Sequence, residues 1–63
     1  MNVRLLSIIQ VMDIVPVSRQ QIYAWMAKGY FPKQRKIGKH RVMWLESDVT
    51  AWVEARVLES ETS

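Results

Sequence analysis

Pro16 separates two helical patterns by a gap that leaves room only for a tight turn. Apolar residues recur at helical spacing from Ile8 to Val15, and a second set of helix signals starts at Ser18. Because proline disfavours the helical conformation in the residue before it, the first helix is predicted to end at about Val15. Only residues 15–17 then separate the two helices. This spacing is typical of a helix–turn–helix pair.

The second helix has the clearer end signals. Ser18 as N-cap and Gln21 three residues later match a capping box, and Gly29 supplies a left-handed stop with Pro32 beyond it. Val17 and Ile22 have the spacing of a hydrophobic staple. The stripe predicted to be buried on this helix consists of Ile22, Trp25 and Met26. Ser7 is the expected N-cap of the first helix.

The segment after Pro32 predicts a β-hairpin. Strands at Lys33–Ile37 and His40–Leu45 flank Gly38-Lys39, which has glycine first, as a two-residue type II′ turn requires. Val42 and Trp44 are expected to face the core. A minor strand is possible at residues 2–6.

A last helix is expected from Glu46 or Ser47 to about Leu58, with Ser47 as its cap, Asp48 in its first turn and Arg56 near its end. The predicted fold is therefore mainly α with a small β-hairpin, a winged helix-turn-helix in the order helix–helix–hairpin–helix. Residues 1–58 form this single domain, and residues 59–63 form a flexible tail.

Composition excludes several classes of protein. The 63 residues contain no cysteine and one histidine, so neither a disulfide framework nor a metal site is predicted. No paired carboxylates suggest an active site, so we expect no enzyme, no catalytic residue and no cofactor. The apolar run in residues 1–12 is interrupted by Ser7 and Gln10 and lacks a signal-peptide cleavage site. We therefore expect a cytoplasmic, nucleoid-associated protein without a membrane segment.

Charge is strongly segregated along the chain. The seven basic residues between Ile14 and Leu45 have no carboxylate among them, and all six acidic residues lie outside this window. Such a stretch attracts a polyanion far more strongly than the net charge of +3 suggests. The alternative is an ordinary solvated surface, but such surfaces usually mix both signs.

The outward face of the second helix suits recognition of DNA bases. In a helix-turn-helix, the first residues of this helix meet the major groove. Arg19 matches guanine O6 and N7, and Gln20 matches adenine N6 and N7. Ser18 is first a cap and second a phosphate donor. Tyr23 either reaches a phosphate through its hydroxyl or packs half-buried on the hairpin, and Lys28 flanks the same face.

The tip of the hairpin carries a second cluster of basic residues. Lys39 and Arg41 suit a wing beside the minor groove, where the negative potential is enhanced. Their alternative role is to protect an exposed edge strand from pairing. His40 is expected either to contact a phosphate or to lie exposed at the surface. Lys36 contributes general attraction for DNA.

Three segments together resemble a known family. The run from Val17 to Lys33 contains S-R-x-x-I-Y-x-W and G-x-F-P, and S-D-V-x-x-W follows from Ser47 to Trp52. The order and spacing, over about residues 4–57, are similar to those of AlpA-like phage regulators. The resemblance implies a sequence-specific DNA-binding protein of a prophage or genomic island. It would act as an excisionase (a recombination directionality factor), as a transcriptional regulator of the integrase, or as both.

The resemblance also implies partners. These are double-stranded DNA with repeated attachment or promoter sites, a tyrosine-type integrase, and neighbouring copies that associate cooperatively on DNA. Its DNA contacts fall on Ser18, Arg19, Gln20 and Tyr23 of the helix and on Lys39 and Arg41 of the wing. The alternative function is a protein-interaction module that docks on integrase or another regulator through its basic face or its acidic last helix, without specific DNA readout.

Overall fold

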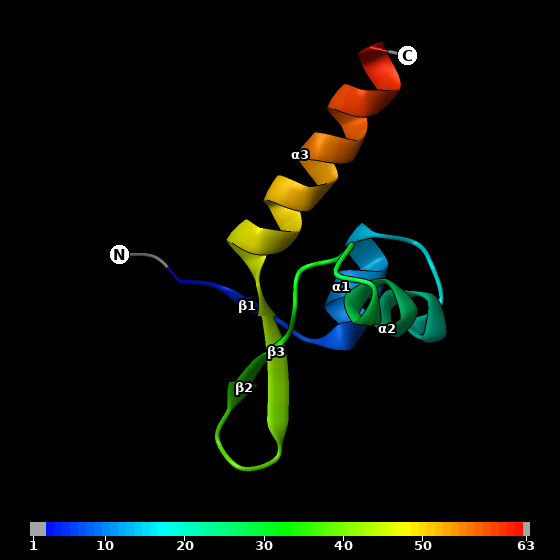
Figure 1. The fold of residues 1–63 in the computed structure, drawn as a ribbon. Helices are drawn as coiled ribbons and strands as arrows, with labels where there is room; N and C mark the ends of the chain where they lie inside the picture. Colours follow the sequence, from blue (N-terminus) through cyan, green and yellow to red (C-terminus); the bar gives the residue numbers. More distant parts are fainter. Residues whose placement is uncertain (1–2, 63) are drawn as a thin grey trace.

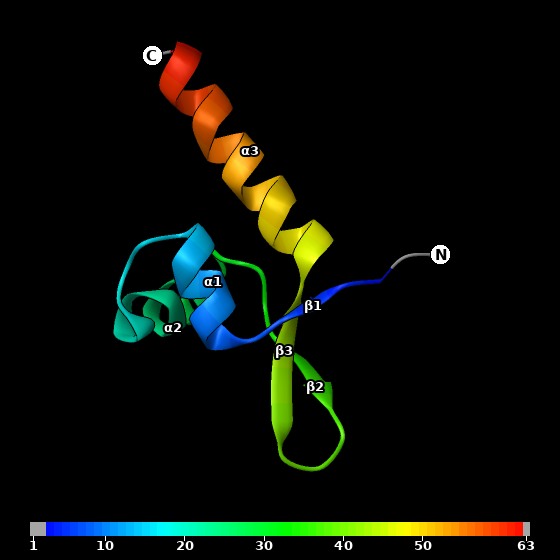
Figure 2. The ribbon, with the colours of Figure 1, turned by 180° about the vertical axis from the view of Figure 1, so that it is seen from behind.

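The computed structural model describes residues 3–62 and has the expected order of elements. They are β1 (Leu5–Leu6), α1 (Ile8–Ile14), α2 (Arg19–Ala27), β2 (Arg35–Ile37), β3 (Arg41–Leu45) and α3 (Glu46–Thr62). Helices α1 and α2 pack beside the sheet, while the β2–β3 hairpin and α3 extend in opposite directions (Figures 1 and 2). The predicted winged helix-turn-helix is confirmed.

Serine hydroxyls begin both helices of the pair. Ser7 and Gln10 form a full capping box, with Ser7 N–H donating to Gln10 Oε1 at 2.9 Å and Gln10 N–H donating to Ser7 Oγ at 3.3 Å. Ser18 Oγ accepts from Gln21 N–H at 3.1 Å. The return bond from Ser18 N–H to the Gln21 side chain is not formed in the described structure. The capping box predicted at Ser18 is therefore only half present.

Helix α2 ends in a Schellman motif. Gly29 has φ of 75° and donates its N–H to Met26 O at 3.0 Å, and Tyr30 N–H donates to Trp25 O at 2.8 Å. The rings of Trp25 and Tyr30 also pack, with centroids 5.5 Å apart. Only glycine adopts this φ without strain, so the predicted stop at Gly29 is confirmed.

The sheet is antiparallel, in the order β1–β3–β2. Leu6 lies opposite Trp44, so a strand is present where the minor one was expected, although Asn2 lies outside the described residues. Ile37 pairs with Arg41, which leaves a loop of three residues, Gly38 to His40. The predicted two-residue turn is therefore wrong. Gly38 does have a positive φ of 74°.

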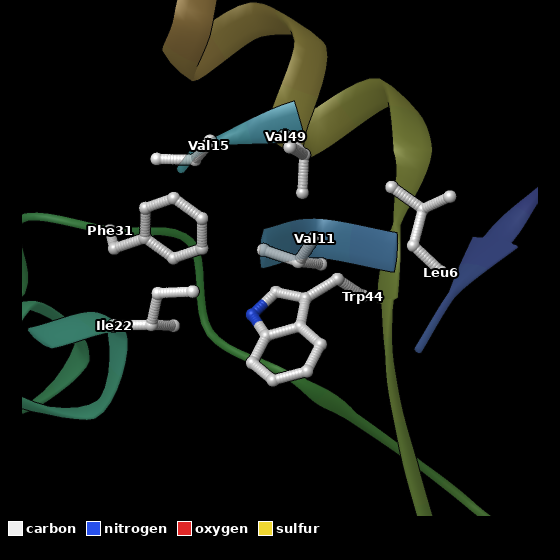
Figure 3. Packing of buried hydrophobic residues seen from close by; sticks show 7 residues of the cluster. All are labelled: Leu6, Val11, Val15, Ile22, Phe31, Trp44 and Val49. Carbon is white, nitrogen blue, oxygen red and sulfur yellow. The ribbon is translucent and has the colours of Figure 1, made fainter. Parts of the chain in front are cut away.

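An apolar cluster joins β1, α1, α2, β3 and α3. It consists of Leu6, Val11, Val15, Ile22, Phe31, Trp44 and Val49, which Figure 3 shows from close by. Trp44 is fully buried, and its Nε1–H donates to Pro32 O at 3.0 Å. That bond satisfies the one polar atom of the indole and connects β3 with the segment after α2. The predicted stripe on α2 is confirmed, with Ile22 fully buried and Trp25 and Met26 packed against the cluster.

Val42 was expected to face the core beside Trp44 but is 40% exposed. It lies on the same face of β3 as Trp44, closer to the hairpin tip. The tip of the hairpin projects past the helices (Figure 1), and Val42 lies only one residue from the end of β3 at this tip.

Helix α3 begins directly after β3, without an intervening cap residue. Glu46 N–H donates to Arg4 O at 2.9 Å, and Ser47 is the second helical residue, so Ser47 as the cap was wrong. Asp48 lies in the first turn as expected. The helix continues to Thr62, past the expected end at Leu58, and includes residues 59–62 of the predicted tail; Ser63 lies outside the described residues.

The longer α3 changes the position of Arg56. It does not lie at the end of the helix; its guanidinium lies 5.0 Å from the Tyr30 ring centroid and 5.3 Å from that of Trp52. The contact with Tyr30 holds α3 against the segment after α2, whereas Trp52 lies on α3 itself. None of the helices in residues 3–62 combines the length and the apolar character needed to cross a membrane.

Candidate nucleic-acid interface

The outward face of α2 carries the side chains expected to recognise DNA. Arg19, Gln20 and Tyr23 are exposed, whereas Ile22 is fully buried on the opposite side. The exposed arc is completed by Ala24, Ala27 and Lys28. The side chains of the two alanines are small, so the middle of this face can approach a groove closely. Arg19 and Gln20 project from the first turn of the helix.

Ser18 lies at the start of this face, and its hydroxyl already accepts a hydrogen bond. Its Oγ accepts the Gln21 N–H, and its proton remains available as a donor. The backbone N–H groups of the first turn point the same way and attract anions. The cap and a phosphate contact are therefore chemically compatible at Ser18.

Tyr23 connects α2 with the hairpin. Its ring meets the Trp44 ring edge-on, with centroids 6.5 Å apart and an angle of 62° between the planes. The side chain is nevertheless 41% exposed. The packing on the hairpin is therefore present, and enough of Tyr23 stays exposed for its hydroxyl to contact a phosphate as well.

The four basic hairpin residues proposed as contacts are all exposed. Lys36 lies on β2, opposite Val42; Lys39 and His40 form the loop; and Arg41 begins β3, opposite Ile37. Residues opposite each other in an antiparallel pair project from the same face of the sheet. Lys36 and Arg41 therefore lie on different faces, and the hairpin presents positive charge on both sides and at its tip.

Ion pairs within the chain leave this charge almost intact. The ion pairs in residues 3–62 are Arg4–Glu46, Arg35–Asp48 and Arg56–Glu59. The stretch from Ile14 to Leu45, which has seven bases and no carboxylate, contributes one residue to these ion pairs. This residue is Arg35, which lies 3.4 Å from Asp48. Of the seven bases in the window, six therefore have no carboxylate partner in the described structure. They are exposed on α2, on the segment that follows it and on the hairpin.

The exposure of two apolar residues of the hairpin was not predicted from the sequence. Ile37 is 39% exposed and Val42 is 40% exposed, and each lies opposite a base, Arg41 and Lys36 respectively. A base on both faces of a short hairpin indicates that neither face is buried near the tip. That signal was visible in the sequence and argued against an inward Val42.

Comparison with known proteins identifies the family of the chain. The family model described as prophage CP4-57 regulatory protein (AlpA) matches residues 4–57. The chain belongs to the AlpA family. It is 43% identical over 54 residues to an uncharacterised protein, ORF88, of Enterobacteria phage P4, and the matched segment covers 86% of this chain and 61% of that protein. The chain thus spans about three fifths of the length of this relative. No solved structure matches it.

Membership of the AlpA family assigns a broad class. The description of the family is that of a prophage regulatory protein, and this chain carries exposed bases on α2 and the hairpin. Within residues 3–62 no group of three or more His, Asp or Glu side chains is placed to hold a metal ion. The chemistry that this surface supports is binding of a polyanion.

Proposed function

We propose that this AlpA-family protein binds a specific double-stranded DNA sequence with α2 in the major groove and the hairpin on the adjacent backbone or minor groove. The observation that carries the proposal is the set of exposed bases on α2 and the hairpin that have no carboxylate partner within residues 3–62. Arg19 and Gln20 have the donor geometry for base edges, and Tyr23 and Lys28 flank them. Lys36, Lys39, His40 and Arg41 supply contacts to phosphate.

Enrichment of binding sites from random DNA, followed by footprinting, tests this proposal. We expect a single motif to be recovered and a protected stretch in which major-groove contacts lie beside a minor-groove or backbone contact. Recovery of no motif, with equal affinity for every sequence, would contradict specific readout. It would instead favour the alternative of a protein-interaction module, for which the acidic α3 provides a surface.

We further propose that the bound sites are repeats beside a phage attachment site or an integrase promoter. The protein would then act as an excisionase, as a regulator of integrase transcription, or as both, inside the cytoplasm and on the nucleoid. Support comes from the prophage regulatory family.

Two assays separate these roles. An excision reaction with the integrase and attachment-site DNA measures the first, and an integrase-promoter reporter measures the second. We expect at least one of them to depend on the protein and to fail with Arg19→Ala. Dependence of neither assay on the protein would contradict the biological role and leave DNA binding itself to be judged by the footprint.

A further inference from the structure

The last turns of α3 extend beyond the other elements and carry exposed apolar side chains (Figures 1 and 2). Val57 is 50% exposed and Leu58 is 60% exposed. Together with Val53, Glu54 and Glu61 they line one shallow hollow on the helix surface. We call these five residues the α3 patch.

The apolar surface continues from the α3 patch to the end of α1. Val53 and Val57 also line a second hollow, together with Ile14 and Pro16. Ile14 is 45% exposed. Because Val53 and Val57 are four residues apart, they form a ridge along α3 between the two hollows. A ridge of this kind, with a groove on either side, is the surface against which a second helix packs.

Two carboxylates of the α3 patch lie outside the ion pairs of the described chain. Within residues 3–62, the carboxylates of α3 that form ion pairs are Glu46, Asp48 and Glu59. Glu54 and Glu61 are not among them, and they lie one turn before and one turn after the apolar centre of the patch. Seven residues of helix separate them by about 10.5 Å along the axis. A complementary partner therefore has apolar side chains at its centre and a basic side chain at each end.

Charge argues against a second α3 patch as this partner. In an antiparallel pair centred between Val57 and Leu58, Glu54 of each copy lies opposite Glu61 of the other. A parallel pair in register places each glutamate opposite its equivalent. Both arrangements bring like charges together, which is unfavourable in an interface. The exposed bases of the chain lie on α2 and the hairpin, where the proposed function uses them for DNA, so the partner is a different protein.

We propose that the α3 patch binds an amphipathic helix of another protein, in which basic residues at positions i and i+7 flank apolar residues at i+3 and i+4. The apolar pair packs on Val57 and Leu58, and each base lies beside one of the two glutamates. The patch is far smaller than the roughly 800 Å² per partner of a stable complex, so a weak, reversible contact is expected. No residue assigned to DNA takes part, so this contact does not depend on DNA binding.

Two synthetic peptides test this occupant in the absence of DNA. One carries Lys at i and i+7 around Leu at i+3 and i+4, and the matched control carries Glu at the two charged positions. Titration of the isotope-labelled protein should shift amide resonances of the α3 patch, with an affinity for the Lys peptide on the order of tenfold higher than for the Glu peptide. Equal affinity for the two peptides, shifts confined to other elements, or no binding of either peptide would overturn the proposal.

Reversal of the charges on the α3 patch supplies the sharpest control. Glu54 and Glu61 are both exposed, so the double variant Glu54→Lys/Glu61→Lys is expected to keep the fold. This variant should prefer the Glu peptide, and the preference should weaken as the salt concentration rises. A preference for the Lys peptide that survives the charge reversal would show that these glutamates do not select the partner, and would overturn the proposal.

The apolar centre is tested by Leu58→Gln, with Leu58→Met as the matched control. Leu58→Gln should lose most of the affinity for the Lys peptide, and Leu58→Met should retain it. Equal affinity of both variants would refute the apolar contact, and a dimer of the natural chain that Leu58→Gln dissociates would place a second copy on the patch instead. Because no DNA is present in these experiments, their failure leaves the proposed DNA binding intact, and failure of DNA binding leaves the peptide result intact.

Discussion

Arg19 is the residue on which base recognition is expected to depend most. It projects from the first turn of α2 and forms no ion pair in the described structure. Arg19→Ala should weaken binding to the preferred sequence by about 1–3 kcal/mol and relax the preference at one base position. Competition binding against single-base variants of the site measures both effects.

Arg4→Ala is the control for this substitution. It removes the same charge from an exposed side chain that pairs with Glu46 and lies away from α2. Its effect on affinity should be small and equal for every sequence. If Arg19→Ala behaved in the same way, Arg19 would position the protein without reading a base.

Trp44 and Trp52 each donate an indole hydrogen bond to a backbone carbonyl, but only Trp44 is fully buried. Trp44→Phe leaves Pro32 O without its partner in the core and creates a cavity, so we expect a loss of roughly 2–4 kcal/mol of unfolding free energy. Trp52→Phe, in a half-buried position, should cost about 1 kcal/mol. Urea denaturation compares the two, and equal losses would contradict the central place of Trp44 in the core.

At the scale of elements, α1 and α2 begin in the same way but face different surroundings. Ser7→Ala and Ser18→Ala each remove an N-cap hydroxyl and should each cost about 1 kcal/mol of stability. Only Ser18 adjoins the proposed interface. Ser18→Ala should therefore also lose roughly 1–2 kcal/mol of DNA-binding free energy, measured at a temperature where both variants are folded. Equal DNA affinity of the two variants would show that Ser18 acts only as a cap.

The hairpin is expected to bind the DNA backbone without reading sequence. Lys39→Ala and Arg41→Ala should each reduce the slope of affinity against salt concentration by about 1 on a log–log plot, and leave the preferred sequence unchanged. Arg35→Ala should change the slope less, because Asp48 lies 3.4 Å from this guanidinium. A change of sequence preference in Arg41→Ala would mean that the hairpin reads bases.

Local signals in the sequence were sufficient to place α1, α2 and the glycine stop between α2 and the hairpin. Ser18, Gly29 and Pro16 act through bonds to near neighbours, so their effects can be predicted without knowledge of the fold. The loop length at Gly38 and the exposure of Val42 could not be predicted this way, because they depend on strand pairing and on where the helices stop covering the sheet. The pairing of Asp48 with Arg35 is likewise a result of tertiary packing.

For the candidate site, the sequence predicted which side chains of α2 face outward. The helical spacing of these side chains relative to the buried Ile22 determines which of them face outward. It did not predict the contact of Tyr23 with Trp44, which links residues from different elements. That contact holds the exposed face of α2 beside β3 of the hairpin, so the two elements can engage the same DNA segment.

At the scale of the whole molecule, the separation of charge is the dominant feature. Acidic residues concentrate on α3, and the unpaired bases concentrate on α2 and the hairpin. Within residues 3–62, Arg35–Asp48 is the one ion pair that joins the stretch from Ile14 to Leu45 to α3. A polyanion is therefore expected to contact α2 and the hairpin and to avoid α3.

The salt dependence of binding to a single preferred site tests the central claim most directly. With about five phosphates neutralised by α2 and the hairpin, the logarithm of affinity should fall with the logarithm of salt concentration with a slope near −4.5. The preference for the selected sequence over random DNA should persist as the salt concentration rises, because base contacts release few ions. A flat salt dependence, together with equal binding to random DNA, would contradict the claim.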